Sequence, residues 1–312
     1  MTFPIYYDFR VAPLSFDFAV FLAIGSAEAR RHGSKHVDLW LIRSHFRRNN
    51  QIEDTYAREY DQWKFNNVVL KLASFTNTIR NTFIIRGGQF EIPKQRKYPP
   101  NYDPSAVDLK SPSSQIPTNF IHLHPYYKLG FVPFIFDAKT YVKDFIKKKY
   151  PLFDTTLTLR TAIQKPHRNI DLSEWYELYK ILEENGRSVL VIPDHDDYYA
   201  EKNYKKFDWT YCEEAAADLE MRLACYQTAT RNISWACGMY TLMFFGNTNF
   251  LIFGKYDEGE QTSSKNFISR KGPIFQEQFP WAKDRLQHID WTERSDLTLK
   301  KMIELSLWHV AE

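Results

Sequence analysis

The 312-residue sequence contains only three cysteines and eleven glycines, and neither residue type forms a recognisable binding motif. Cys212, Cys225 and Cys237 lack CxxC spacing, so we expect buried thiols in a reducing compartment. No GxGxxG follows a first strand and no GxxxxGK[ST] occurs, which argues against a dinucleotide dehydrogenase and a P-loop NTPase. Because no GxSxG elbow is present either, nucleophilic hydrolysis has no support.

A long apolar run is also missing. The longest apolar segments, 18–24 and 240–253, are shorter than the ~20 residues that span a bilayer. Residues 1–16 carry no basic stretch ahead of an apolar core, so we expect no signal peptide. These absences predict a cytoplasmic protein without a transmembrane segment.

The charge balance excludes a further class of partner. The net charge is only +3, which is too small to argue for binding to nucleic acid. Hydrophobic residues make up 44% and charged residues 25%, as in an ordinary soluble globular protein. Any attraction for anions must therefore come from a local cluster of cations.

Strand-like and helix-like segments alternate along both halves of the chain. Strands joined by helices are expected to run parallel. The pattern predicts an α/β protein with two Rossmann-like domains, residues 1–150 and 151–312, that face a central cleft. Strands are expected at 3–9, 37–42, 83–85, 155–160, 188–192 and 250–253, and helices at about 16–31, 53–79, 138–149, 171–184, 213–228 and 295–309.

A basic loop follows the strand predicted at 155–160. Arg160 ends the strand, and Arg168 and Asn169 lie in the loop before the next helix. Ligands of open α/β sheets bind beyond the carboxyl ends of strands, and guanidinium groups clamp phosphate there. The following helix N-terminus adds a partial positive charge. The alternative is that Arg160 pairs with a carboxylate and Arg168 is merely solvated.

Further polar groups follow the neighbouring strand at 188–192. Asp194 is placed to accept hydrogen bonds from a nucleoside or to act as a general base, although it could equally cap a turn. The run 194–197 reads Asp-His-Asp-Asp, but consecutive side chains diverge and no partner ligands are identified. We therefore expect no metal site.

Two other segments supply candidates. Arg231, Asn232 and Ser234 precede Gly238 and an apolar run, so this segment is suited to offering backbone amides to a ligand. The alternative is a helix start capped by Asn232 or Ser234. His122 and His124 alternate as on a strand, which makes His124 a candidate base lining the cleft, or else an ordinary core or surface histidine.

Taken together, these residues resemble a group of bacterial glycosyltransferase-like proteins, distantly similar to the fucosyltransferase and heptosyltransferase branches of the GT-B fold. The resemblance covers most of the chain in order. The residues that carry it are Thr156–Arg160, Arg168-Asn169, Glu174-Trp175, Val189–Asp194, Ala215–Tyr226 and Arg231–Gly254, with 16–42 matching the acceptor-side domain.

The resemblance implies a nucleotide-sugar donor bound by the second domain without a metal or other cofactor. Arg160 would contact the donor diphosphate, Asp194 would lie near the nucleoside, and Ser234 or its neighbours would approach the phosphates. The last helix would return toward the first domain. A base from the first domain, with Asp8, Asp17 and His124 as candidates, would deprotonate a glycan, lipid-linked or protein acceptor.

One departure from that family limits the implied activity. The fucosyltransferase branch carries paired arginines in a His-x-Arg-Arg motif, whereas this strand end has Arg160 alone. A non-catalytic binding or assembly protein of the same architecture is therefore the main alternative, and a two-domain nucleotide-sugar epimerase is a lesser one. Peripheral contact with a membrane is left open.

Overall fold

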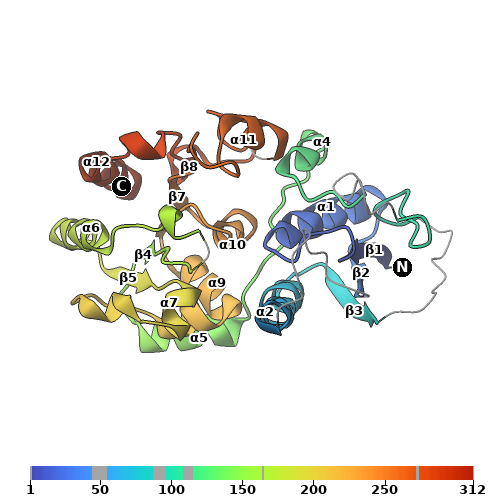
Figure 1. Cartoon of the computed structure of the whole chain (residues 1–312), viewed down its shortest axis with the longest axis horizontal. Helices are drawn as coiled ribbons and strands as arrows, with labels where there is room; N and C mark the ends of the chain where they lie inside the picture. The colour runs from blue at the N-terminus through green and yellow to red at the C-terminus, as the bar shows by residue number, and fades with distance from the viewer. Residues whose placement is uncertain are drawn as a thin grey trace. The chain divides into compact units, whose positions relative to one another are not determined.

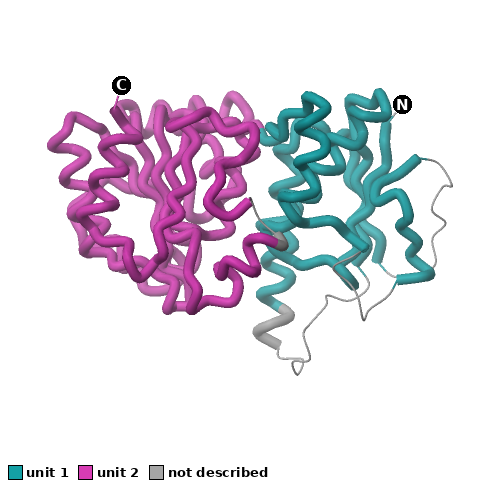
Figure 2. The backbone as a smooth tube through the Cα atoms, turned by 90° about the horizontal axis from the view of Figure 1, so that it is seen from above, with its two compact units in different colours: residues 1–136 teal, residues 137–312 magenta. Residues whose placement is uncertain are grey.

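The computed structural model describes residues 2–43, 55–86, 96–107, 115–163, 165–271 and 274–311. The chain forms two compact units, Met1–Phe136 and Asp137–Glu312, each built around its own parallel sheet (Figures 1 and 2). This division falls before the predicted boundary at residue 150, because helix α5 (Thr140–Lys149) packs on α9 (Leu219–Thr228) of the second unit. Among the described residues, no helix is both long and apolar enough to cross a membrane.

The first unit contains a three-stranded parallel sheet in the order β1-β2-β3. Its strands are β1 (Phe3–Asp8), β2 (Val37–Ile42) and β3 (Ile79–Ile85). Helix α1 (Asp17–Arg31) connects the first two and is buried along most of its length. Aromatic rings of Tyr7, Phe18 and Phe21 pack edge to face between β1 and α1, which joins the helix to the sheet.

The connection from β2 to β3 is helical but shorter than predicted. Its described part, from residue 55 on, consists of α2 (Thr55–Lys64), the π-helical segment η1 (Phe65–Val69) and α3 (Leu70–Ser74). The helix predicted to reach residue 79 ends at Ser74, because the following residues lead into β3, which begins at Ile79.

The strand predicted around His122 and His124 is wrong. These residues lie in a 3-10 turn, η3 (Phe120–Leu123), and at the start of α4 (His124–Lys128). Pro125 occupies one of the first helical positions, where its fixed backbone angle and missing N–H favour a helix start.

The second unit contains a five-stranded parallel sheet in the order β5-β4-β6-β7-β8. The chain passes from β4 to β5 on one side and then returns to place β6 on the other side of β4. The carboxyl ends of β4 and β6 therefore form the switch point of the sheet, where open α/β proteins bind ligands. The strands are β4 (Thr155–Thr158), β5 (Val189–Ile192), β6 (Arg231–Trp235), β7 (Phe250–Phe253) and β8 (Gln287–Ile289).

Helices and short turns connect these strands (Figure 1). Strand and helix side chains such as Leu157, Ile233, Trp175 and Met302 form one buried cluster. The remaining helices are α6 (Leu172–Glu184), α7 (His195–Tyr199), α8 (Glu213–Ala217), α10 (Tyr240–Phe245), α11 (Lys265–Lys271) and α12 (Leu299–Val310), and the 3-10 segments are η4 (Pro166–Arg168), η5 (Asn203–Lys206), η6 (Asp284–Leu286) and η7 (Arg294–Asp296).

Two predicted helices have different boundaries in the structure. The helix expected over 213–228 is divided at Asp218, whose backbone is extended. The Asp218 carboxylate caps α9 by accepting hydrogen bonds from the N–H groups of Glu220 and Met221. The last helix begins at Leu299 with Thr298 as its cap, rather than at Ser295. Residues 294–296 instead form the 3-10 segment η7.

Helix α12 packs on α6 and on strands β6 and β7 of its own unit. Its last carbonyl groups accept hydrogen bonds from two arginines: Arg231 Nε lies 2.9 Å from the His309 oxygen, and Arg187 Nη2 lies 2.6 Å from the Val310 oxygen. Cations are favourable at a helix C-terminus, so these contacts anchor the end of the chain. A return of this helix to the first domain stays a prediction.

Candidate anion-binding site

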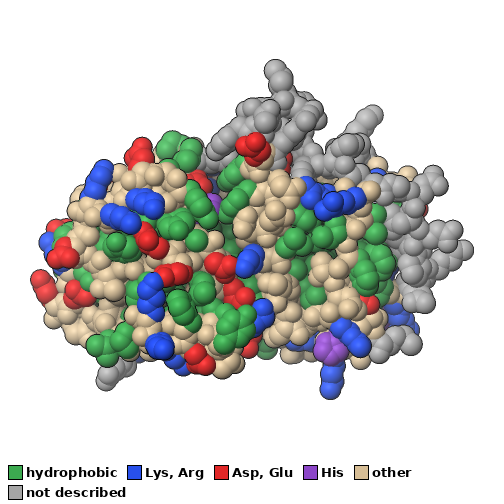
Figure 3. All heavy atoms as spheres, turned by 90° about the horizontal axis from the view of Figure 1, so that it is seen from below, with side chains coloured by type: hydrophobic (Ala, Val, Ile, Leu, Met, Phe, Trp, Pro, Cys, Tyr) green, Lys and Arg blue, Asp and Glu red, His purple; other side chains and the backbone are tan. Residues whose placement is uncertain are grey.

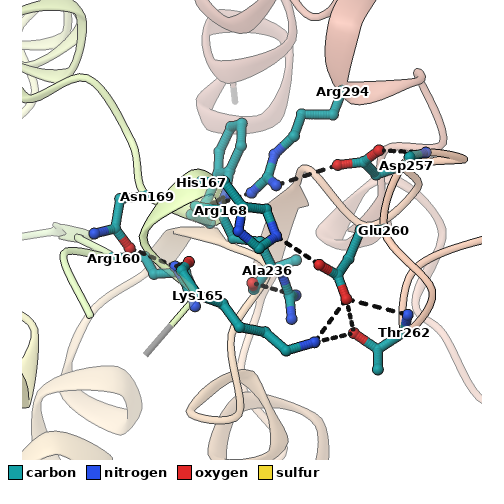
Figure 4. Close-up of polar contacts among 12 residues, drawn as sticks. Arg160, Lys165, His167, Arg168, Asn169, Ala236, Asp257, Glu260, Thr262 and Arg294 are labelled. Carbon is teal, nitrogen blue, oxygen red and sulfur yellow. Dashed lines mark hydrogen bonds and ion pairs between the residues drawn. The ribbon is translucent and has the colours of Figure 1, made fainter. Parts of the chain in front are cut away.

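Three arginines gather at the switch point of the second unit: Arg160, Arg168 and Arg294 (Figure 4). Arg160 follows β4, and Arg168 closes η4 in the loop after it. Arg294 opens η7, beyond β8. Parallel strands end at a common edge, so segments distant in sequence place their cations together there.

Arg160 is held by the loop that follows it. Its side chain is 6% exposed, and Nη1 donates to Asn169 Oδ1 at 2.5 Å and to the Lys165 carbonyl at 3.3 Å. Asn169 also accepts from Ala162 N–H at 3.0 Å and donates to the Ala162 carbonyl at 2.9 Å. Asn169 therefore closes this loop and fixes the direction of the Arg160 guanidinium.

Arg168 and Arg294 are joined through the end of β6. Trp235 Nε1 donates to the Arg168 carbonyl at 3.1 Å, and Arg294 Nη2 donates to the same oxygen at 2.6 Å. The Arg294 guanidinium lies 5.0 Å from the centre of the Trp235 ring, within the range of a cation–π contact. The Arg168 side chain reaches toward the Ala236 carbonyl at 3.5 Å.

The charges of the three arginines affect one another. Burial lowers the pKa of Arg160 and of Arg294, and the charge of Arg168 lowers both pKa values further. Arginine stays protonated in proteins, so this repulsion is retained at neutral pH. Among the described residues, Arg168 forms no ion pair, whereas Arg294 Nη1 forms one with Asp257 Oδ2 at 3.3 Å. A phosphate group would relieve the repulsion and accept several charge-assisted hydrogen bonds.

The concentration of positive charge is local. On the face drawn in Figure 3, Lys and Arg side chains are interspersed with Asp and Glu rather than gathered in one broad field. This agrees with a net charge of only +3. Attraction for an anion at the arginines therefore depends on close contacts and falls off over about 10 Å at ordinary salt concentrations.

Asp194 lies on the same edge, after β5. Its side chain caps α7 by accepting from Asp196 N–H at 3.0 Å, and it also accepts from Thr161 N–H at 3.3 Å. Burial raises the pKa of Asp194. The carboxylate thus ties the ends of β4 and β5 together, and its contacts are those of a turn-capping residue.

An open hollow of about 870 Å³ lies beside this junction. It is lined by the loop after β4 and by acidic residues of α7, including Asp196 and Asp197. Asp196 accepts a hydrogen bond from Ile163 N–H at 2.9 Å, and Asp197 accepts one from Asn203 N–H at 3.0 Å. Both carboxylates therefore shape the walls of the hollow.

Two of the predicted ligand residues lie away from this edge. Arg231 and Asn232 begin β6, and in a parallel sheet the amino end of a strand is opposite its ligand-binding end. Asn232 is fully buried and bonds Thr156, Tyr226 and Asn249, so it links strands and loops. The alternative of a helix start at this segment is also wrong, because the segment is a strand.

Ser234 lies closer to the site but does not face it as a donor. Its side chain is fully buried, and Oγ donates to the Trp235 carbonyl at 2.9 Å. Its neighbours from Ala236 onward extend beyond the strand to the edge where Arg168 reaches. Any contact with phosphates from this segment would come from those neighbours.

The candidate bases of the first unit occupy different environments. Asp8 is fully buried at the end of β1, where Arg10 and Tyr102 bind its carboxylate. Asp17 is exposed at the start of α1 and accepts from Ser15 Oγ at 3.1 Å. His124 begins α4, whose Tyr126 donates to Glu28 near the other end of α1. Asp17 is thus the exposed carboxylate of the three candidates.

Sequence reasoning missed Arg294 and the loop after β7. Asp257 and Glu260 in that loop contact Arg294 and Lys165, respectively. The loop could have been found, because it directly follows a strand that was predicted. Arg294 gave no such signal, because β8 is only three residues long and lacks an apolar run.

Comparison with protein families found none that matches the chain, and comparison with curated proteins found none either. Solved structures do resemble it. The E. coli ADP-heptose lps heptosyltransferase II has a TM-score of 0.51 at 9% identity, over 99% of this chain and 98% of that one. The fold is of the GT-B type. The predicted α/β architecture with two Rossmann-like units is confirmed.

Two further structures align over nearly the whole chain at lower scores. A glycosyl transferase family 9 protein from Veillonella parvula has a TM-score of 0.47 at 9% identity, covering 99% of this chain and 90% of that one. The E. coli heptosyltransferase WaaC with ADP has a TM-score of 0.46 at 12% identity, covering 99% and 100%.

Proposed function

We propose that this protein is a glycosyltransferase that takes its sugar from a nucleoside-diphosphate donor bound by the second unit. The observation that carries the proposal is the cluster of Arg160, Arg168 and Arg294 at the switch point of a parallel sheet. The GT-B-type fold supports it, since the similar E. coli structure is named as a heptosyltransferase that uses ADP-heptose.

In this proposal the arginines bind the diphosphate and stabilise the charge that develops as it leaves the sugar. Guanidinium groups fixed in a partly buried site supply such stabilisation without a covalent intermediate. Arg160 is oriented by Asn169 and Arg294 by Asp257, so little reorganisation is required when the anion arrives. The single arginine of the sequence motif is thereby supplemented by Arg168 and Arg294.

The acceptor in this proposal is a glycan, a lipid-linked sugar or a glycosylated protein. Its hydroxyl group must lose a proton, and we assign Asp17 of the first unit as the base. Asp17 is exposed at the start of α1, whereas Asp8 is fully buried at the end of β1. Replacement Asp17→Asn is expected to lower transfer about 100-fold while leaving donor affinity unchanged.

Titration calorimetry with ADP, GDP and UDP tests the donor site. We expect one of these nucleotides to bind the protein and Arg168→Ala to weaken that binding about 100-fold, since charge-assisted hydrogen bonds to a phosphate are lost. Arg231→Ala is the matched control, because this arginine lies at the amino end of β6. The proposal fails if none of the three nucleotides binds, or if Arg168→Ala binds as tightly as the original protein.

A second candidate function is a binding protein of the same architecture that performs no transfer. The single Arg160 at the end of β4 favours it, because the fucosyltransferase branch that the sequence resembles carries paired arginines there. Incubation with radiolabelled nucleotide sugars separates the two candidates. Release of free nucleoside diphosphate that Arg168→Ala abolishes would exclude the non-catalytic alternative.

A further inference from the structure

The loop that follows β7, residues 256–263 and hereafter the acidic loop, is fixed by its own backbone hydrogen bonds. Asp257 and Ser263 are joined at 3.2 Å, and Glu260 N–H donates to the Asp257 carbonyl at 3.3 Å. Arg294 N–H also donates to the Tyr256 carbonyl at 3.0 Å. Glu260 therefore projects from a defined turn rather than from a freely moving segment.

Glu260 is the most heavily engaged carboxylate near the arginines (Figure 4). Glu260 is 7% exposed. Its carboxylate forms hydrogen bonds with Lys165 Nζ at 2.6 Å, His167 Nε2 at 2.6 Å and Thr262 Oγ1 at 2.8 Å. The hydrogen bonds from Lys165 and His167 hold its pKa well below the usual range. The carboxylate is therefore charged at neutral pH and spans the acidic loop and the loop after β4.

The segment held by Glu260 is the one that shapes the anion site. The Lys165 carbonyl accepts from Arg160, and the Arg168 carbonyl accepts from Trp235 and Arg294. Lys165 also has a left-handed backbone, with φ of 57°, which is strained for a residue with a Cβ. Contacts of its side chain with Glu260 help to maintain that strained turn.

We propose that Glu260 is a positioning residue for the anion site: it fixes the 165–169 segment so that Arg160 and Arg168 converge on one diphosphate. This inference concerns the site of the proposed function, but it requires only that the site bind a diphosphate. At metal sites, groups that orient the binding residues from behind contribute about 10–100-fold to affinity.

A carboxylate with no positioning role would have the opposite effect. Removing a negative charge near an anion site strengthens anion binding by simple electrostatics. Glu260→Gln keeps the size of the side chain but removes its charge and weakens its bonds to Lys165 and His167. A loss of anion affinity in this variant therefore cannot come from its change in net charge.

Calorimetric titration with inorganic pyrophosphate at pH 8 tests the inference. We expect Glu260→Gln to bind pyrophosphate about tenfold more weakly than the original protein. Glu258→Gln is the matched control: it removes the same charge from an exposed residue of the acidic loop and should bind as tightly or slightly more tightly. Unchanged or tighter binding by Glu260→Gln, or no pyrophosphate binding by the original protein, overturns the inference.

A second variant covers the case in which Glu260→Gln does not fold. The His167 side chain is 59% exposed, so His167→Ala should retain the fold while removing one of the bonds to Glu260. Its affinity for pyrophosphate at pH 8 should fall several-fold, and an unchanged affinity would contradict the positioning role. Pyrophosphate binding without binding of any nucleotide would leave this inference standing and reject the proposed donor.

Discussion

The carboxyl edges of the two parallel sheets are built alike but carry their charge differently. In the first unit, the carboxylate of the buried Asp8 accepts hydrogen bonds from Arg10 Nη2 at 2.7 Å and from the Tyr102 hydroxyl at 2.7 Å. Its charge is therefore neutralised locally. In the second unit, burial lowers the pKa of Arg160 and of Arg294, and the nearby charge of Arg168 lowers both further. The charges of the first arrangement are already balanced, whereas the second brings like charges together that a bound anion would offset.

This difference separates what stabilises an edge from what makes it a binding site. A buried carboxylate with matched donors contributes to folding and has little remaining capacity for a ligand. Clustered like charges do the reverse, since they destabilise the empty site and gain energy when an anion enters. Substitutions should therefore affect stability in the first unit and anion affinity in the second.

The largest expected effect is on the balanced pair of the first unit. Asp8→Asn should lower the free energy of unfolding by about 3 kcal/mol, because it leaves the partly buried Arg10 without its counter-ion. Urea unfolding followed by circular dichroism measures this change. Pyrophosphate affinity should be unaffected, and its loss would show that the two edges are not independent.

A glycine supports the arginine edge of the second unit. Gly254 has φ of +65°, and a Cβ placed there would lie 2.6 Å from the ring of Trp235, on which Arg294 stacks. Gly254→Ala should cost about 2 kcal/mol of stability from backbone strain, together with a clash. Gly186→Ala is the matched control, because its φ is +77° but no atom lies within 4 Å of the added Cβ. Equal thermal stability of the two variants would exclude a role for the clash.

Acid should destabilise the second unit through its buried histidine His309. Burial lowers the pKa of His309 to about 3, so the unfolded chain binds a proton below about pH 6.5 while the folded unit does not. Stability is therefore full above that pH and falls by about 1 kcal/mol between pH 7 and pH 5.5. Urea unfolding at both pH values measures it, and the change should be smaller in His309→Leu, in which His195 and His288, whose pKa values burial also lowers, remain.

In the first unit, the carboxyl group of Glu28 affects stability only at a lower pH, because its pKa is lowered from the ordinary value of a glutamate. Glu28 is partly desolvated, which raises its pKa, but hydrogen bonds from Arg31 and Tyr126 give a net lowering. Its contribution is present above its ordinary pKa and is lost only as the pH falls further. A loss of this contribution above the ordinary pKa of Glu28 would contradict this sign.

The smallest expected effect concerns the ring beneath Arg294. Trp235→Phe removes the hydrogen bond to the Arg168 carbonyl, worth about 1 kcal/mol, and should weaken pyrophosphate binding about fivefold. Trp291→Phe removes a similar bond, to the Glu277 carbonyl, and serves as the matched control outside the site. Calorimetry should show a weaker affinity only in the first variant.

The alternation of strands and helices was readable from the sequence, because buried parallel strands require short apolar runs and crossover helices require an amphipathic face. Val189–Ile192 and Phe250–Phe253 are such runs, and both strands have the predicted bounds or lie within one residue of them. Boundaries set by single caps were less predictable, as Asp218 and Thr298 show.

Arg160 and Arg168 could be named as candidates from the sequence because strand, loop and helix form one local unit, in which a cation after a strand end has a defined place. Arg294 and Glu260 could not, because they lie 126 residues from Arg168 and 95 from Lys165. Local patterns determine elements and their ends, whereas the sheet order determines which ends meet. Only the tertiary structure brings Arg294 to the strand end that carries Arg160 and Arg168, which makes a cluster of three arginines.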